Sequence, residues 1–259
     1  MENQISTMET MANDTGMPYS TDSINEYLLY LAENNLLIAD DQNNFFYTND
    51  KINGKLICYT KDDMISEINY CYDTEITNQV LLSDYYNSHN NIEKGAMLVE
   101  SINDEYGFCA DLDFYTNVKV TEFPVKAEAK IYCLALDLMF LPGLKEFEEI
   151  AKANPIIDKD STSSVNPIYM GSKMLIASGL IPESDVPIPS MAVISAEILD
   201  VKTRVNEFTK KEFFVLRCDG TIGEFELLCS PEFANENMKA GGVVNGYVLF
   251  RMEVMRIIN

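Results

Sequence analysis

The sequence predicts an α+β protein, in which an N-terminal module of mixed helices and strands precedes a small antiparallel β-barrel of five strands. Three strand-like runs follow one another over residues 191–229 with short turns between them, and a fourth lies at 243–250. A fifth apolar run precedes them at 128–140. Before residue 124, segments with apolar residues at every third or fourth position alternate with short β-branched and aromatic runs, which indicates a mixed module.

Turn signals set the order of strands within the barrel. Over residues 193–201 the side chains alternate with the period of two that a strand with one buried face requires. The polar segment 206–211 predicts a turn to the next strand. Asp219-Gly220 tolerates the positive φ angles of a tight turn, so it predicts a β-hairpin between the second and third of these strands.

A short helix is expected before the last strand, because Ser230 can cap it, Pro231 suits its first turn and Gly241 can end it. Five strands with a helical insert before the last one are similar to a barrel of the OB type, closed or partly open. Because strand counts alone also fit two packed sheets, a β-sandwich is the alternative. An open meander would expose two hydrophobic edges, so we expect closure, or covering by the N-terminal half.

Composition divides the chain into three parts. Residues 1–22 are polar and lack periodicity, which predicts a flexible tail. Residues 23–126 form the predicted acidic α+β module, and residues 127–259 form the β-barrel-like module, with an insertion at 141–190. From the 3–4 spacing and the capping residues, helices are expected at 23–35, 61–72, 75–86, 144–153 and 169–178.

The charge is strongly negative and uneven. The chain has 41 acidic and 19 basic residues, a formal net charge of −22. Residues 1–100 contain 17 of the acids and only 4 lysines, and every arginine lies after residue 150. Such a surface repels nucleic acid and anionic membranes and attracts basic partners. A simpler interpretation is that the acidity supports solubility.

The cysteine pattern predicts a compartment. Six cysteines are scattered without the CxxC spacing of metal or redox motifs, mostly within apolar runs, as is typical of buried free thiols. No secretory signal is visible at the start of the sequence, and the most apolar stretch, 131–144, is too short to span a bilayer. The sequence therefore predicts a cytoplasmic protein that does not cross a membrane.

Most hydrolytic and metal chemistries lack their usual residues. His89 is the only histidine and lies in a polar loop, whereas imidazole-based metal sites and catalytic triads need a positioned histidine. Asp111, Asp113 and Glu122 follow a calcium-loop spacing in part, but Thr116 stands where that loop needs glycine. No catalytic, cofactor-binding or metal-ligating residue is predicted.

One cluster on the predicted barrel combines basic and aromatic side chains, which are able to neutralise and stack on single-stranded nucleic acid. The acids Glu207, Glu212 and Asp219 lie near it in the sequence and oppose such binding. The members of this possible binding face are Arg204, Phe208, Lys210, Lys211, Phe213 and Arg217.

Three functions are compatible with these observations. The first is a non-enzymatic binding protein whose partner is another protein, with basic partners favoured by charge. The second is an OB-like binder of nucleic acid or oligosaccharide, although nucleic acid is disfavoured by the net charge. The third is an enzyme that uses carboxylates alone or with a divalent ion. The partner and the oligomeric state stay open at this point.

Overall fold

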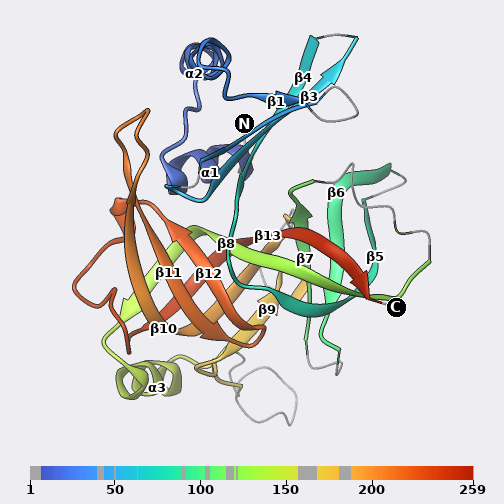
Figure 1. Ribbon diagram of the computed structural model, residues 1–259. Helices are drawn as coiled ribbons and strands as arrows, with labels where there is room; N and C mark the ends of the chain where they lie inside the picture. Colours follow the sequence, from blue (N-terminus) through green and yellow to red (C-terminus); the bar gives the residue numbers. More distant parts are fainter. Residues whose placement is uncertain are drawn as a thin grey trace, which may run out of the picture.

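The structure is a computed structural model that describes residues 7–39, 44–49, 51–62, 64–88, 91–102, 106–114, 120, 122–156, 168–180 and 188–258. Within these ranges it combines three α-helices with two β-sheets (Figure 1), as expected for an α+β protein. The helices are α1 (Thr7–Thr15), α2 (Thr21–Glu33) and α3 (Leu144–Ala153), with short 3-10 turns η1 (Ser178–Leu180) and η2 (Pro231–Phe233).

The strands belong to a small and a large sheet. The small sheet has the order β1-β2-β3-β4, and it consists of β1 (Ile38–Ala39), β2 (Phe45–Asn49), β3 (Gly54–Lys61) and β4 (Met64–Tyr72). The nine strands of the large sheet are β5 (Asn78–Ser88), β6 (Asn91–Glu100), β7 (Gly107–Leu112), β8 (Val125–Leu141), β9 (Met174–Ala177), β10 (Met191–Val205), β11 (Glu212–Gly220), β12 (Gly223–Cys229) and β13 (Val243–Ile258).

Five strands of the large sheet pair in a ring. β10 pairs with β11, β11 with β12, β12 with β8, β8 with β13, and β13 again with β10. Of these five ring pairs, only β12–β8 is parallel. These are the five strands expected for the barrel, but they are not a separate five-stranded sheet, because β5, β6, β7 and β9 extend the same sheet to nine strands. The expectation of a small five-stranded unit is corrected to this extent.

Alternation explains why the ring strands fold as they do. On β10, Ala192, Ile194, Ala196 and Ile198 are buried in the first hydrophobic core. On the other face of the strand, Val193 and Glu197 are partly exposed, although Ser195 between them is buried. The predicted hairpin is confirmed, since β11 and β12 pair antiparallel. Its turn lies two residues later than expected, because Asp219 and Gly220 still pair with Glu224 and Gly223.

The helices expected at 61–72 and 75–86 are wrong, because these residues form strands β4 and β5. In the second segment, Ile76 and Val80 have the i, i+4 spacing of a helix. The residues that are buried together are instead Val80 and Leu82, which lie two positions apart. That period of two belongs to a strand. In the first segment, β4 pairs antiparallel with β3 along its whole length.

The other helix predictions met different outcomes. Helix α3 is confirmed, and α2 begins beside its cap Ser20, whose side chain accepts the Ser23 N–H. The helix expected at 169–178 is wrong, because strand β9 and turn η1 replace most of it. The helix after Pro231 is limited to the short turn η2.

Part of the segment 1–22, for which the sequence predicts a flexible tail, lies within the described residues. Helix α1 occupies Thr7–Thr15, and Met11 and Met17 are fully buried. Methionine fills irregular gaps in a core well, so the methionine-containing segment docks instead of remaining in solvent. The described N-terminal residues therefore belong to the packed structure.

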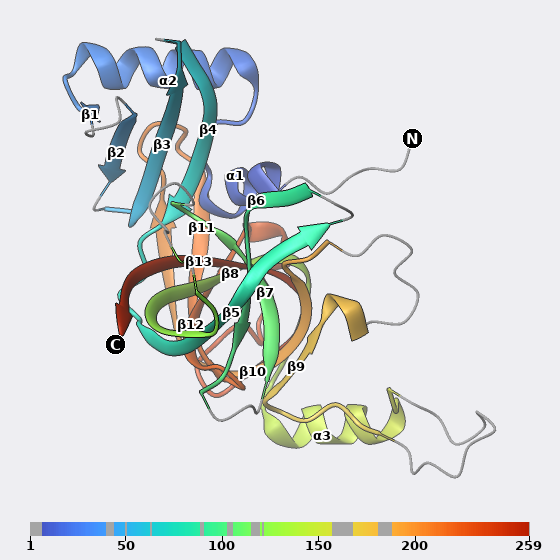
Figure 2. The same cartoon turned by 90° about the vertical axis from the view of Figure 1, so that its right-hand side faces the viewer.

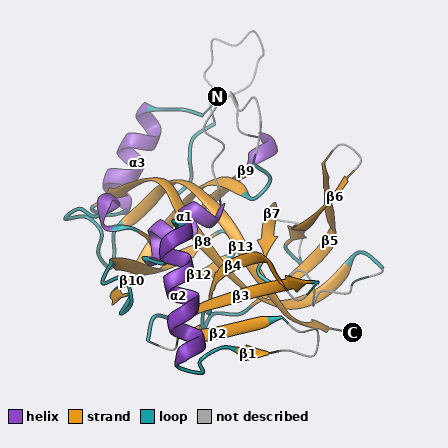
Figure 3. Ribbon diagram, turned by 90° about the horizontal axis from the view of Figure 1, so that it is seen from above, coloured by secondary structure: helices purple, strands orange, loops and turns teal. Residues whose placement is uncertain are grey.

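The N-terminal elements cover one side of the ring. In the second core, Met11 of α1 and Tyr27 of α2 pack with Phe213 and Val215 of β11 and with Leu249 of β13. Helix α2 lies across the small sheet (Figures 2 and 3). The first core likewise joins β5 and β6 to the ring strands. Both cores thus contain residues from both sides of the module boundary at 126/127, which itself stays a prediction.

Candidate functional site

The predicted basic-aromatic set does not form one open face. Phe213 is fully buried in the second core. Phe208 packs on the rings of Tyr27 and Tyr30, with centroid distances of 4.6 and 5.6 Å. Because these two rings are already engaged inside the protein, they do not offer the stacking platform that single-stranded nucleic acid needs.

The basic members of the set are separated as well. The Arg217 Nε donates to Glu224 Oε2 at 2.7 Å, so its charge is neutralised locally. The Arg204 Nη1 donates to the Lys51 carbonyl oxygen at 2.9 Å. Lys210 and Lys211 lie exposed in the turn between β10 and β11, and Lys211 also lines a polar hollow of about 360 Å³ beside α1.

A buried polar cluster joins the two sheets. The Arg251 Nε and Nη2 donate to Asp113 Oδ1 at 2.9 and 2.7 Å, and the Tyr132 hydroxyl donates to the same oxygen at 3.0 Å. Arg251 is 3% exposed and Asp113 is fully buried. From the small sheet, Asn69 Nδ2 donates to the Asp113 carbonyl oxygen at 3.0 Å. This carboxylate is thus held by a guanidinium and a tyrosine hydroxyl.

Electrostatics gives this cluster a structural role. Burial raises the pKa of Asp113, and the Arg251 charge and the hydrogen bonds from Arg251 and Tyr132 oppose that rise. Tyr132 also accepts the backbone N–H of Tyr72 at 3.1 Å. The cluster therefore links β4 of the small sheet with β8 and β13 of the large sheet.

Asp14 of α1 is a second buried acid, and it accepts hydrogen bonds from two backbone amides. Its Oδ2 accepts the Ala135 N–H at 2.7 Å, and its Oδ1 accepts the Ser230 N–H at 3.1 Å. These two amides follow the last parallel pair, Leu228 with Leu134, at which β12 and β8 separate. Burial raises the pKa of Asp14, and the two backbone hydrogen bonds oppose the rise. Asp14 thus satisfies amides that the sheet no longer pairs.

A third ionic group lies nearer the surface, between the two sheets. Asp73 forms ion pairs with Lys130 and Lys55, and the Lys55 Nζ also donates to Glu253 Oε2 at 2.9 Å. Partial burial of Asp73 opposes ionisation, but the hydrogen bonds and charges of the two lysines prevail and lower its pKa below the ordinary value of 3.8.

Replacing Asp73 with asparagine is expected to lower the unfolding free energy at pH 7 by about 1 kcal/mol. Because the folded-state pKa is lowered, the stabilisation by Asp73 is present above its ordinary value of 3.8 and is lost as the pH falls below it. Urea unfolding of both proteins at pH 7 and pH 3 measures this loss. Asp200→Asn, at an exposed position on β10, is the control. An Asp73→Asn effect that is the same at both pH values would contradict the assignment.

The outer face of α2 is acidic and apolar at once. Its exposed acids are Asp22, Glu26 and Glu33, and between them Leu29 is 63% exposed and Tyr30 is 46% exposed. None of these acids forms an ion pair with a described lysine or arginine. The last turn of α2 contains no basic residue. We call these five residues the α2 face.

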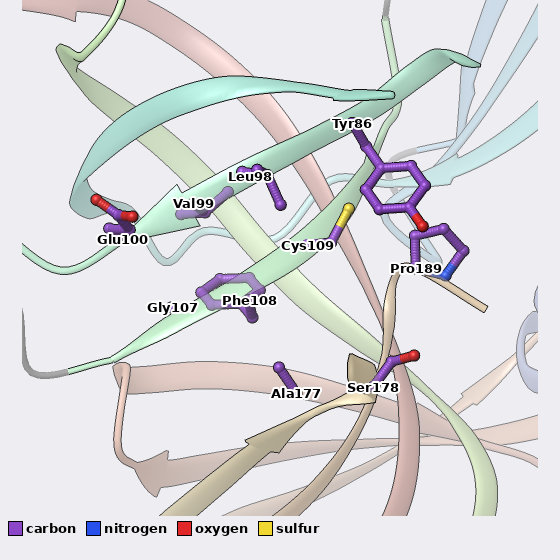
Figure 4. Close-up of a pocket in the computed structure, with 10 residues that line it drawn as sticks. All are labelled: Tyr86, Leu98, Val99, Glu100, Gly107, Phe108, Cys109, Ala177, Ser178 and Pro189. Carbon is purple, nitrogen blue, oxygen red and sulfur yellow. The ribbon is translucent and has the colours of Figure 1, made fainter. Parts of the chain in front are cut away.

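A pocket of about 300 Å³ opens between the β5–β6–β7 strands and β9 (Figure 4). Its lining is mainly apolar and contains Tyr86, Leu98, Val99, Glu100, Gly107, Phe108, Cys109, Ala177, Ser178 and Pro189. The sequence analysis missed this pocket, because its walls come from four strands that only the fold brings together.

Other predicted features have plain outcomes. His89 lies outside the described residues. All six cysteines are buried, and none of them forms a disulfide bond. In the described ranges, no three His, Cys, Asp or Glu side chains are grouped so that they could hold a metal ion. None of the described helices is long and apolar enough to cross a membrane.

Comparisons of the chain with protein-family models, with curated proteins and with solved structures found no match. The functional argument therefore depends on the geometry of this molecule.

Proposed function

We propose that this protein is a non-enzymatic interaction protein whose α2 face binds a basic segment of another protein. The observation that carries the proposal is the combination of three acids with two exposed apolar side chains on one side of a single helix. Each feature alone is common on protein surfaces. Together they match a partner that presents positive charge around an apolar contact.

Helix geometry supports this combination. Glu26, Leu29, Tyr30 and Glu33 are spaced i, i+3, i+4 and i+7, and such positions lie on one side of a helix. The opposite side carries Tyr27 and Leu31, which are buried in the second core. Packing of that inner side fixes the helix, so the outer side is presented in a defined orientation.

The surrounding charge supports a basic partner. Of the four lysines in residues 1–100, Lys51 is paired with Glu207, and Lys55 with Asp73 and Glu253. Acids in this part of the chain outnumber lysines about fourfold. The local potential is thus negative, which accelerates the approach of a cationic partner.

The five-stranded ring serves in this proposal as an OB-like scaffold. OB barrels bind oligonucleotides and oligosaccharides through the outer face of their second and third strands. In the antiparallel meander β10–β11–β12, the second and third strands are β11 and β12. Side chains such as Phe213 and Val215 of β11 pack in the second core with residues of α1 and the small sheet. The alternative of an OB-like binder of nucleic acid or oligosaccharide therefore has less support than the α2 face.

A carboxylate-based enzyme also has less support. The deeply buried acids Asp14 and Asp113 are engaged with backbone amides and with Arg251, respectively. Neither lies among the residues that line the pocket of Figure 4. Both carboxylates thus have structural partners that account for their burial.

We also propose a reducing, cytoplasmic location. The six buried thiols form no disulfide bond, and burial raises the pKa of Cys58 to about 11. Thiols of this kind stay protonated and unreactive. Such cysteines are typical of compartments in which thiols are kept reduced.

The test compares two variants that remove the same charge from different helices. The first replaces the three acids of the α2 face, as Asp22→Asn/Glu26→Gln/Glu33→Gln. The matched control replaces three exposed acids of α3, as Glu146→Gln/Glu148→Gln/Glu149→Gln. The probe is a synthetic peptide of lysines and leucines, titrated at about 50 and 300 mM salt by fluorescence anisotropy.

Binding to the unaltered protein is expected to weaken as salt rises. The α2 variant is expected to lose about tenfold in affinity at low salt, because three exposed ion pairs contribute about 0.5 kcal/mol each. The α3 control is expected to bind nearly as tightly as the unaltered protein. Equal losses in the two variants would show that net charge, and not the α2 face, is responsible, and would overturn the proposal.

A further inference from the structure

The pocket between the β5–β7 strands and β9 is lined on one side by side chains of the first hydrophobic core. Phe108 is buried in the first core, and its ring packs on Phe250 with a centroid distance of 4.4 Å and on Tyr106 at 6.1 Å. Val99 of the neighbouring strand is also fully buried. Because these side chains are held by the core, the pocket exists before any ligand arrives, and binding requires little ordering of the protein.

The lining selects against negative charge. Leu98, Val99, Phe108, Ala177 and Pro189 supply most of the apolar wall. Among the described residues, no lysine or arginine lines the pocket, and the only charged lining residue is the acid Glu100. An anion placed here would lose its water without gaining a positive partner, which is costly. A neutral ligand does not meet this cost.

The polar residues of the lining lie at its two ends. In Figure 4, Glu100 lies toward one end of the pocket, and Tyr86, Ser178 and Pro189 lie toward the other. The Ser178 hydroxyl is buried beneath the lining, without accessible surface, so it offers no hydrogen-bond donor to a molecule in the pocket. The wall that a ligand meets is therefore mainly apolar.

The volume sets the size of the ligand. An apolar cavity of about 150 Å³ is sufficient for benzene. The present pocket, at about 300 Å³, has room for two fused rings. Its volume is also at the lower limit of about 300 Å³ for small-molecule sites in proteins.

We propose that this pocket is a binding site for a neutral, apolar small molecule of two-ring size. The site is separate from the α2 face, since none of its lining residues belongs to α2. Success or failure of this proposal therefore leaves the interaction proposal unchanged.

The probes are three near-isosteric naphthalenes. 2-Acetylnaphthalene is neutral and has an acceptor, 2-ethylnaphthalene lacks the acceptor, and 2-naphthoate carries a negative charge. Ligand-observed NMR titrations with the full chain measure each affinity. Saturable binding of 2-acetylnaphthalene is expected, with 2-naphthoate weaker by about tenfold or more.

A substitution in the wall locates the binding. Ala177→Leu fills part of the pocket and is expected to weaken 2-acetylnaphthalene by about tenfold, because the added side chain takes the space of the ligand. Ala153→Leu, at an exposed position at the end of α3, is the matched control and is expected to change nothing. 2-Ethylnaphthalene is expected to respond to both substitutions in the same way.

Circular dichroism melting checks that each variant folds. If Ala177→Leu unfolds, Leu98→Gln replaces it, because Leu98 lines the pocket but is 39% exposed. Equal affinities for 2-acetylnaphthalene and 2-naphthoate would overturn the proposal. So would identical behaviour of the Ala177→Leu and Ala153→Leu variants, since binding would then take place elsewhere.

Discussion

Arg251→Met is expected to lower the unfolding free energy by about 3–5 kcal/mol, because it leaves the buried Asp113 carboxylate without its counter-charge. Two nitrogens of Arg251 contact one Asp113 oxygen, and the second oxygen of Asp113 already has no hydrogen-bond partner among the described residues. The site thus has no spare donor to replace the guanidinium. Urea unfolding at pH 7 measures the loss.

Arg256→Met is the matched control on the same strand. Arg256 also pairs with an acid, Glu128, at 2.9 Å, but its side chain is 70% exposed. Exposed ion pairs contribute about 0–1 kcal/mol, so this variant is expected to remain close to the unaltered protein. Similar losses in the two variants would mean that burial of the Arg251 pair has no special weight.

A double variant separates the charge from its packing. In Arg251→Met/Asp113→Leu neither charge is buried, and replacement of a buried ion pair by apolar residues is often neutral or stabilising. We therefore expect the double variant to recover part of the stability lost in Arg251→Met. A double variant less stable than the single one would contradict this account.

The C-terminal strands could be predicted from the sequence, because their signals are local. The alternation in 191–205 and the turn residues around Asp219 act over a few positions, and both led to correct strands. The closure of the ring through a parallel β12–β8 pair, and its extension by four further strands, depend on residues far apart in the chain. No local pattern specifies those contacts.

The N-terminal strands show how a local pattern misleads. Val80 has two apolar neighbours that indicate different structures. Leu82 lies two positions after it, as on one face of a strand, and Ile76 lies four positions before it, as on one side of a helix. Only pairing of β5 with β6 and β8 decides between the two. Short apolar runs are ambiguous in this way, and tertiary pairing determined the outcome.

The candidate sites divide along the same line. The α2 face could be predicted from the sequence, since Glu26, Leu29, Tyr30 and Glu33 have helical spacing within the helix expected at 23–35. The burial of Phe213 also follows from strand alternation beside the exposed Glu212. The amides that Asp14 accepts and the Arg251 side chain that pairs with Asp113 are more than one hundred residues away from these acids, so no local pattern in the sequence indicates these roles.

Gly246→Ala is expected to lower the unfolding free energy by about 3 kcal/mol or more. Gly246 has a φ of +152°, a conformation that residues with a side chain rarely adopt. A Cβ there would lie directly against the Asp137 carbonyl oxygen and 3.0 Å from the Leu138 Cα. Both are backbone atoms of β8, so the clash cannot be relieved by rotating a side chain.

Gly241→Ala separates backbone strain from this close approach. Gly241 also has a positive φ, +82°, but a Cβ there would meet nothing within 4 Å. Its substitution is expected to cost about 1–2 kcal/mol, the strain of the backbone alone. Thermal unfolding of both variants gives the comparison, and equal losses would show that the contact with β8 is unimportant.

A larger loss at Gly246 would mean that β13 keeps its register beside the irregularity at Tyr247 and Val248 only because position 246 lacks a side chain. The same strand positions Arg251 five residues later, so this register also places the guanidinium that the buried cluster requires.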